Sequence, residues 1–223
     1  MSPPEVSVIV PVYNNARTLP ELCRRLGAAL GDRSFEIVMV DDLSSDDSFA
    51  VMSDLGVVAL ASDRNRGQNG AILAGLRRAG APICCVLDAD LQDPPEALPA
   101  LLARLDAGDV GVVFSSRRAQ QSITSRLFRS AVHRLFPTLP PHPCLCFAMS
   151  GDVRGALIEV ARDTDYLPAV IGALQVKTTE IAVERAPRPS GESGYVGSKR
   201  VRYAAAALWS ALQLRARLAL KRR

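Results

Sequence analysis

The sequence predicts an α/β fold built on a mostly parallel sheet flanked by helices. Strand-like and helix-like segments alternate with short turns through the first half of the 223-residue chain, as expected for parallel strands joined by helical crossovers. Several strand-like segments are continuous apolar runs, which is typical of strands buried on both faces. Acidic motifs follow two of these strands, and open α/β sheets bind ligands at the carboxyl ends of strands.

The elements of the first half follow from the period of their apolar residues. A run rich in β-branched residues predicts the first strand over Val6–Val12. Leucines at helical spacing predict a helix over Ala16–Leu30. The alternation continues with predicted strands at Phe35–Val40, Gly56–Ala61, Ile83–Leu87 and Val110–Phe114, and with predicted helices at Asn69–Arg78 and Glu96–Leu105.

The second half of the chain is less regular. A helix predicted over Ile123–Phe136 ends at a proline-rich stretch that cannot be helical throughout. A late strand is predicted at Thr178–Val183, and a polar stretch rich in Pro, Gly and Ser precedes a final basic helix. We therefore expect one α/β domain over residues 1–198 and a basic amphipathic helix over residues 199–223.

The charge of the chain is divided unevenly along its length. Of 27 Lys and Arg residues, eight lie from Lys199 onward, where there is no acidic residue, so the rest of the chain holds 19 basic against 23 acidic residues. This asymmetry indicates a local interaction surface and argues against a nucleic-acid-binding fold. The apolar run Tyr203–Leu214 contains Trp209 and is too short to span a bilayer, but it suits a helix on an anionic membrane surface. A helix packed on its own domain is the alternative.

The sequence favours a cytoplasmic location. No secretory signal is recognised at the start, and no apolar run approaches the roughly 20 residues that cross a bilayer. The five cysteines, with an adjacent pair at Cys84-Cys85, do not form a disulfide pattern. Cys144 and Cys146 lack a second ligand pair, so packed thiols are favoured over a zinc site. Within the cytoplasm, peripheral attachment to the cytoplasmic face of a membrane is the alternative that the basic helix suggests.

Two predicted strands end in acidic turns, Asp41-Asp42 and Asp88-Ala89-Asp90, the second followed by Gln92 and Asp93. Bare phosphate would be repelled there, but Mg²⁺ or Mn²⁺ would bind carboxylate oxygens and complete its shell with water and substrate phosphate. In an extended Asp-x-Asp segment both carboxylates point the same way. A solvated or helix-capping pair of aspartates is the alternative, and the position directly after an apolar strand favours the metal.

Four sequence blocks, in order and at plausible spacing, resemble glycosyltransferase family 2. They are Ser7–Asn15, Glu36–Asp46, Arg64–Ala71 and Asp88–Glu96, and the resemblance covers roughly residues 5–118. The last two blocks are similar to the branch that contains dolichol-phosphate mannose synthase and bacterial polyprenyl-phosphate sugar transferases. The resemblance implies the GT-A fold, a UDP- or GDP-sugar donor and a divalent metal, Mg²⁺ or Mn²⁺.

The resemblance also implies roles for individual residues around the donor. Pro11 and Tyr13 would line the nucleobase pocket, and Asp42 would bond the edge of the nucleobase. The family often has Glu where Asn15 stands. The metal would be surrounded by Asp88, Asp90 and Gln92, with Asp90 the most direct ligand. The complete donor set is Pro11, Tyr13, Asn15, Asp41, Asp42, Asn65, Gly67, Asp88 and Arg117.

The acceptor side departs from the family pattern. The stretch His142–Ala148 has the expected Phe but lacks the family's Asp and Arg, and Gly194 stands where a Lys is usual. The predicted acceptor-binding residues are Arg126, Arg129, Arg185, Arg188 and Ser193, and the candidate catalytic residues are Asp90, Asp93 and Arg117. A lipid-phosphate acceptor needs no protein base, whereas a hydroxyl acceptor would need one, and Asp93 is then the nearest candidate. A helix-capping role for Asp93 is the alternative.

The function predicted from these residues is inverting transfer of a sugar from a nucleotide sugar to a polyprenyl- or dolichyl-phosphate acceptor. Transfer to a soluble hydroxyl acceptor and non-catalytic binding of a nucleotide sugar are the alternatives, because the acceptor motifs are altered. A nucleotidyltransferase is disfavoured, because no Gly-rich loop bearing Lys or Arg follows the first strand.

Overall fold

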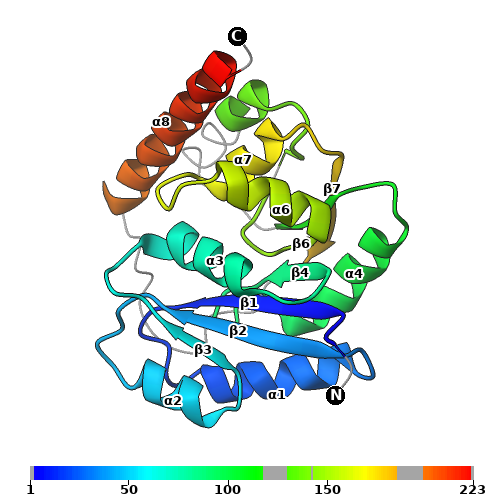
Figure 1. The fold of residues 1–223 in the computed structure, drawn as a ribbon, viewed down its shortest axis with the longest axis vertical. Helices are drawn as coiled ribbons and strands as arrows, with labels where there is room; N and C mark the ends of the chain where they lie inside the picture. The colour runs from blue at the N-terminus through cyan, green and yellow to red at the C-terminus, as the bar shows by residue number, and fades with distance from the viewer. Residues whose placement is uncertain (1–2, 118–129, 142, 185–197, 222–223) are drawn as a thin grey trace.

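The computed structural model describes residues 3–117, 130–141, 143–184 and 198–221. Its centre is a seven-stranded sheet with the order β3-β2-β1-β4-β6-β5-β7 (Figure 1). On one side the strands are all parallel, with β1 between β2 and β4 and β3 at the edge. These strands are β1 (Val6–Val12), β2 (Phe35–Asp41), β3 (Val58–Ala61) and β4 (Ile83–Val86).

The other side of the sheet is mixed. Strand β6 (Phe147–Ser150) runs antiparallel to both β4 and β5 (Val112–Arg117), and β7 (Thr178–Val183) pairs parallel with β5. The predicted mostly parallel sheet is therefore confirmed, with β6 as an antiparallel strand that was not predicted. Beyond the β5–β6 ladder, Ser115 N donates to the carbonyl of Cys146, the residue before β6, at 2.8 Å.

Helices cover both faces of the sheet. Helices α1, α2 and α4 lie on one face, α3, α6 and α7 on the other, and α8 packs against α7 (Figure 1). Residues 130–135 are also helical. The bounds are α1 (Leu19–Leu30), α2 (Ser48–Asp54), α3 (Gly67–Arg78), α4 (Leu98–Asp106) after a 3₁₀ turn (Pro95–Ala97), α6 (Gly151–Val160), α7 (Leu167–Ala173) and α8 (Ser198–Lys221).

The core follows from the alternation of side chains along β1, every residue of which is buried. Val8 and Val10 belong to the hydrophobic cluster under α1 and α4, whereas Ile9 belongs to the cluster under α3. Helix α3 lies close to the sheet because it has a glycine at the contact. A Cβ atom added to Gly75 would lie 2.4 Å from Ile9 Cγ2.

The predicted elements agree with the structure, apart from their ends. The bounds of β1 and β7 are those predicted. Helix α1 begins three residues later than predicted, because Thr18 N donates to the Asn15 carbonyl in a turn that precedes the helix. Strand β5 continues three residues past the predicted end at Phe114. The predicted helix over Ile123–Phe136 lies partly outside the described residues.

Helix α8 has two different faces. Its inner face contributes Ala207, Ala211 and Leu214 to the core of the rest of the protein, whereas Trp209 is 63% exposed and Leu212 is also exposed on the outer face. The helix packs on the rest of the protein, as the alternative interpretation of the sequence expected, and it also has an exposed apolar side. Within the described residues, no helix combines the length and apolarity needed to cross a bilayer. The division of the chain at residue 198 stays a prediction.

Candidate functional site at the carboxyl edge of the sheet

The parallel strands β1, β2 and β4 end at the same edge of the sheet, and the predicted donor residues follow them. Hydrogen bonds join the three strand ends to one another and to their helices. Asp42 N donates to the Val12 carbonyl at 2.8 Å, and Thr18 Oγ1 donates to the Ala89 carbonyl at 2.7 Å. The segments that the sequence placed in one site are therefore neighbours in the fold.

The loop after β1 is bound to the loop after β2. Asn14 N donates to Ser44 Oγ at 2.9 Å, Ser45 N donates to Asn14 Oδ1 at 2.8 Å, and Asn15 N donates to Ser48 Oγ at 2.9 Å. Tyr13 precedes this network with its side chain 54% exposed. These bonds fix the backbone beside Tyr13 and leave its ring accessible to a ligand.

Asp41 has a carboxylate oxygen to which none of the described residues donates a hydrogen bond. The residue is only 6% exposed, and its Oδ2 accepts from Ser44 N at 3.2 Å. Its Oδ1 is buried, and no described group donates a hydrogen bond to it. Such an unmet acceptor costs about 1–3 kcal/mol, so it favours a ligand that brings a donor group.

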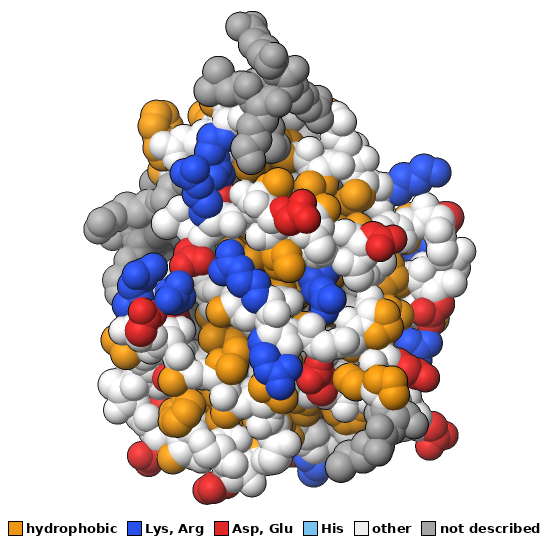
Figure 2. Space-filling view, viewed as in Figure 1, with side chains coloured by type: hydrophobic (Ala, Val, Ile, Leu, Met, Phe, Trp, Pro, Cys, Tyr) orange, Lys and Arg blue, Asp and Glu red, His pale blue; other side chains and the backbone are white. Residues whose placement is uncertain are grey.

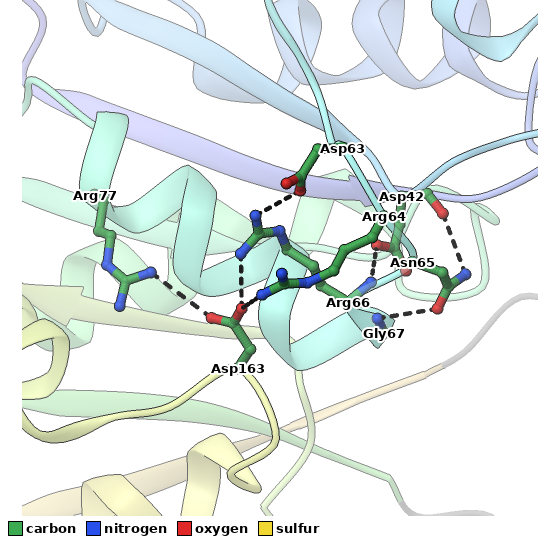
Figure 3. A network of polar contacts seen from close by, with 8 residues as sticks. All are labelled: Asp42, Asp63, Arg64, Asn65, Arg66, Gly67, Arg77 and Asp163. Atoms are coloured by element: carbon green, nitrogen blue, oxygen red, sulfur yellow. Dashed lines mark hydrogen bonds and ion pairs between the residues drawn. The ribbon is translucent and has the colours of Figure 1, made fainter.

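Asp42 is used differently, although it is the next residue in the chain. Its Oδ1 accepts from Arg66 N at 2.6 Å, and its carbonyl accepts from Asn65 Nδ2 at 3.2 Å (Figure 3). Burial raises the pKa of Asp42, and the N–H groups of Arg66 and Gly67 oppose this shift by stabilising the carboxylate. Asp42 thus binds the end of β2 to the start of α3.

The predicted residues Asn65 and Gly67 form the turn that begins α3. Gly67 N donates to Asn65 Oδ1 at 3.2 Å, as Figure 3 shows. Gly67 has a φ of +71°, in the region that side chains disfavour, so a glycine suits this position. Sequence reasoning did not assign a role to Gln68, whose Nε2 donates to Asp88 Oδ1 at 2.7 Å. The signal for Gln68 was its place in the third family-like block.

The Asp-x-Asp segment lies in the loop after β4. Asp88, Asp90 and Gln92 are all half-buried, and Gln92 N donates to Asp90 Oδ1 at 3.1 Å. Among the residues described, no group of three or more His, Cys, Asp or Glu side chains could hold a metal ion. Two carboxylates and an amide nevertheless fit Mg²⁺ or Mn²⁺, because these ions keep waters and substrate phosphates among their ligands.

Backbone strain is concentrated at the same edge. Four described non-glycine residues have a positive φ, and Asn14, Leu43 and Leu91 are three of them. These three follow β1, β2 and β4 respectively. Left-handed conformations cost free energy, and they persist at sites where the surrounding structure enforces them, so their clustering here supports a functional site.

Asp93 is 2% exposed and lies deeper than Asp88, Asp90 and Gln92, the proposed metal ligands in the loop after β4, which we call the metal loop. Burial, and then the negative charge of Asp93, raise the pKa of the Cys146 thiol. The role of Asp93 as a general base or as a helix cap stays a prediction.

Two further residues of the predicted donor set lie in strands of the sheet. Pro11 is buried in β1, and Arg117 is the last residue of β5. The acceptor-binding candidates all lie outside the described residues, namely Arg126, Arg129, Arg185, Arg188 and Ser193.

Comparison with solved structures identifies the fold. Solved structures of glucosyl-3-phosphoglycerate synthase from Mycobacterium tuberculosis share the architecture. The complex with phosphoglyceric acid has a TM-score of 0.72 at 18% identity, covering 95% of this chain and 80% of that chain. The complex with Mn²⁺, UDP-glucose and phosphoglyceric acid has a TM-score of 0.69 at 18% identity, covering 93% and 80%. The fold is the GT-A fold, as predicted.

Sequence comparison identifies the family. The family model described as glycosyl transferase family 2 matches residues 7–145. Undecaprenyl-phosphate 4-deoxy-4-formamido-L-arabinose transferase of Pseudomonas fluorescens is 36% identical over 203 residues, which cover 85% of this chain and 60% of the relative. The enzyme of that name from Pseudomonas paraeruginosa is 38% identical over 204 residues, with the same shares. The chain therefore belongs to glycosyl transferase family 2, and it spans about 60% of the length of these relatives.

Proposed function

We propose that the chain transfers a sugar from a nucleoside-diphosphate sugar to a polyprenyl-phosphate acceptor, with inversion at the anomeric carbon. The observation that carries the proposal is the acidic edge of the sheet, where Asp88 and Asp90 follow β4 and Asp41, with its unsatisfied buried oxygen, ends β2. The names of the relatives support a lipid-phosphate acceptor. A solved neighbour with bound UDP-glucose and Mn²⁺ supports a nucleotide-sugar donor and a divalent metal.

The side chains of the metal loop are already oriented by the protein. Asp88, Asp90 and Gln92 would hold Mg²⁺ or Mn²⁺, which when bound would neutralise charge on the leaving diphosphate. Gln68 fixes the Asp88 carboxylate, and the Gln92 N–H fixes Asp90. Carboxylates held in this way lose little conformational freedom when the donor binds, so donor binding costs less free energy.

The acceptor chemistry is consistent with the burial of Asp93. A phosphate acceptor is already an anion, so it needs cations for positioning and no protein base. A hydroxyl acceptor would need a base within hydrogen-bond reach of its proton. Asp93 is almost fully buried, which favours the phosphate acceptor. Arg117, at the end of β5, is a candidate cation for the acceptor or donor phosphate.

A transfer assay tests the proposal. The protein is incubated with a panel of UDP- and GDP-sugars, Mn²⁺ and undecaprenyl phosphate in detergent, and the lipid product is measured. A sugar-lipid product that depends on Mn²⁺ is expected. Equal transfer to a water-soluble hydroxyl acceptor would contradict the lipid-phosphate assignment, and nucleotide-sugar binding without transfer or hydrolysis would identify a non-catalytic binding protein.

Asp41 is expected to contribute more to donor binding than Asp42. The change Asp41→Asn keeps the shape of the side chain but replaces its carboxylate, with the unmet acceptor, by an amide. It should weaken nucleotide-sugar binding by about 1–3 kcal/mol in calorimetry. The matched change Asp42→Asn should chiefly lower thermal stability, because the Asp42 carboxylate is bonded to Arg66 N. A larger loss of affinity in Asp42→Asn than in Asp41→Asn would contradict this expectation and support Asp42 as the residue that bonds the nucleobase.

We further propose that the outer face of α8 attaches the protein to the cytoplasmic face of a membrane. Trp209 and Leu212 are exposed there, and the cations from Lys199 onward, apart from Arg217, which pairs with Asp165, would each add about 1 kcal/mol near an anionic leaflet. Co-sedimentation with vesicles should require anionic lipid and decrease with salt. Trp209→Ala should reduce binding several-fold, whereas Phe49→Ala, at an exposed aromatic residue on α2, should not. Equal binding to neutral vesicles would contradict the proposal.

A further inference from the structure

The loop between α6 and α7, residues 161–166, carries two aspartates that bind opposite sides of the protein. We call it the bridging loop. Asp163 forms ion pairs with arginines just before and within α3, whereas Asp165 forms one with an arginine of α8. The bridging loop belongs to none of the motifs predicted from the sequence, and the proposed function does not use it.

Asp163 is surrounded by cations. Its carboxylate lies 2.8 Å from Arg66 Nη1, 3.7 Å from Arg77 Nη1 and 3.9 Å from Arg64 Nη2 (Figure 3). On the surface, Lys and Arg side chains form a band at the level of α3, with acidic side chains among them (Figure 2). Asp163 and Arg66 are both about three-quarters buried, so solvent screens their ion pair less than an exposed one.

Arg66 connects this ion pair to the donor side of the sheet. Its side chain binds Asp163, and its backbone N–H donates to Asp42 Oδ1 at 2.6 Å. Two residues later, Gln68 donates to Asp88 of the metal loop at 2.7 Å. The position of residues 66–68 therefore determines where the Asp42 and Asp88 side chains are held.

The bridging loop itself is firmly anchored. Asp165 Oδ2 accepts from Arg217 Nη2 at 2.6 Å and from Arg162 N at 2.9 Å, and Tyr166 N donates to Ser210 Oγ at 3.1 Å. Asp163 also packs on α3, since a Cβ atom added to Gly70 would lie 3.2 Å from Asp163 Cβ. The carboxylate of Asp163 is thus a fixed point for the start of α3.

We infer that Asp163 is a positioning residue of the donor site, acting through Arg66. Without the charge of Asp163, the Arg66 side chain would keep, among the described residues, only its ion pair with Asp63, whose own side chain is mostly exposed. The start of α3 would then be less constrained, and the bonds to Asp42 and Asp88 would open more often. The effect on nucleotide affinity rests on the proposed function, but the effect on the backbone of α3 does not.

Amide hydrogen exchange tests the inference without any ligand. Asp163→Asn keeps the shape of the side chain and removes its charge, and it should increase exchange of the Arg66 and Gly67 amides about tenfold. Asp163→Glu keeps the charge and should restore most of the protection. Asp106→Asn is the matched control, because Asp106 forms an ion pair with Arg33 between other elements and should leave residues 62–70 unchanged.

A second measurement follows nucleotide binding by calorimetry, with UDP and GDP as probes in the presence of Mn²⁺. The nucleotide that binds the unmodified protein more tightly should bind Asp163→Asn about tenfold more weakly, and Asp106→Asn unchanged. If neither nucleotide binds the unmodified protein, the proposed function fails, while the exchange result still decides the role of Asp163. Unchanged exchange at Arg66 in Asp163→Asn, or protection in Asp163→Glu as low as in Asp163→Asn, would overturn the inference.

Discussion

Replacing Asp90 with alanine is expected to abolish sugar transfer and to remove the effect of Mn²⁺ on nucleotide affinity. Asp90 is the proposed principal ligand of the metal, and a bound divalent ion contributes several kcal/mol of charge stabilisation in the transition state, which corresponds to a loss of roughly 10³-fold or more. The fold should persist, because the bond from Gln92 N to Asp90 is local to the loop. Titrating nucleotide at increasing Mn²⁺ concentration measures the uncoupling directly.

The control for Asp90→Ala is Asp109→Ala. Asp109 is an exposed carboxylate that pairs with Arg104 and lies outside the proposed site, so its loss should leave transfer and metal dependence unchanged. Full transfer by the unmodified protein in excess EDTA would show that the Asp-x-Asp loop does not act through a metal.

Asp165→Ala is expected to cause the largest loss of stability. Asp165 is 3% exposed and forms an ion pair with Arg217 of α8, and removing one partner leaves the other partly buried without its counter-charge. Breaking such a pair costs about 3 kcal/mol, at the low end for buried pairs because Arg217 is one-quarter exposed. Urea denaturation should report this loss of free energy of unfolding. Thermal unfolding should show a decrease in melting temperature of roughly 6–12 °C.

A double variant separates the charge from the packing. Asp165→Ala combined with Arg217→Met removes both charges and keeps an apolar side chain on α8, so it should recover much of the lost stability. A double-mutant cycle measures the coupling between the two residues. If Asp165→Ala unfolds at the same urea concentration as the unmodified protein, the contact between α8 and the bridging loop contributes nothing to stability.

The half of the fold that contains β1 to β4 was largely predictable from the sequence, because local and tertiary preferences agree there. β1 is buried along its whole length, and its β-branched sequence has the composition of such a strand. By contrast, β6 is only four residues long and directly precedes α6, so its sequence carries too few residues to show a period. Its antiparallel direction depends on its neighbours β4 and β5, which lie far from it in the sequence.

Part of the site was not predictable for a similar reason. Asp41 and Asp42 are adjacent and chemically identical, and they differ only in which tertiary groups reach them. Arg66 N satisfies Asp42, whereas Oδ1 of Asp41 has no described donor. Asp163 gave no local signal at all, because Arg66, its shortest contact, lies 97 residues away in the chain. Such assignments need the folded structure.

The pairing of β5 with β6 has a consequence for how the chain can change in length. Ser115 of β5 is hydrogen-bonded to Cys146, the residue before β6, so the chain between them begins and ends at neighbouring positions. Within it, Ser116 and Arg117 pair with β7, and Val132, Phe136 and Leu139 are buried in the core. A change in length between Ser115 and Cys146 therefore has to preserve both this strand pairing and these core contacts.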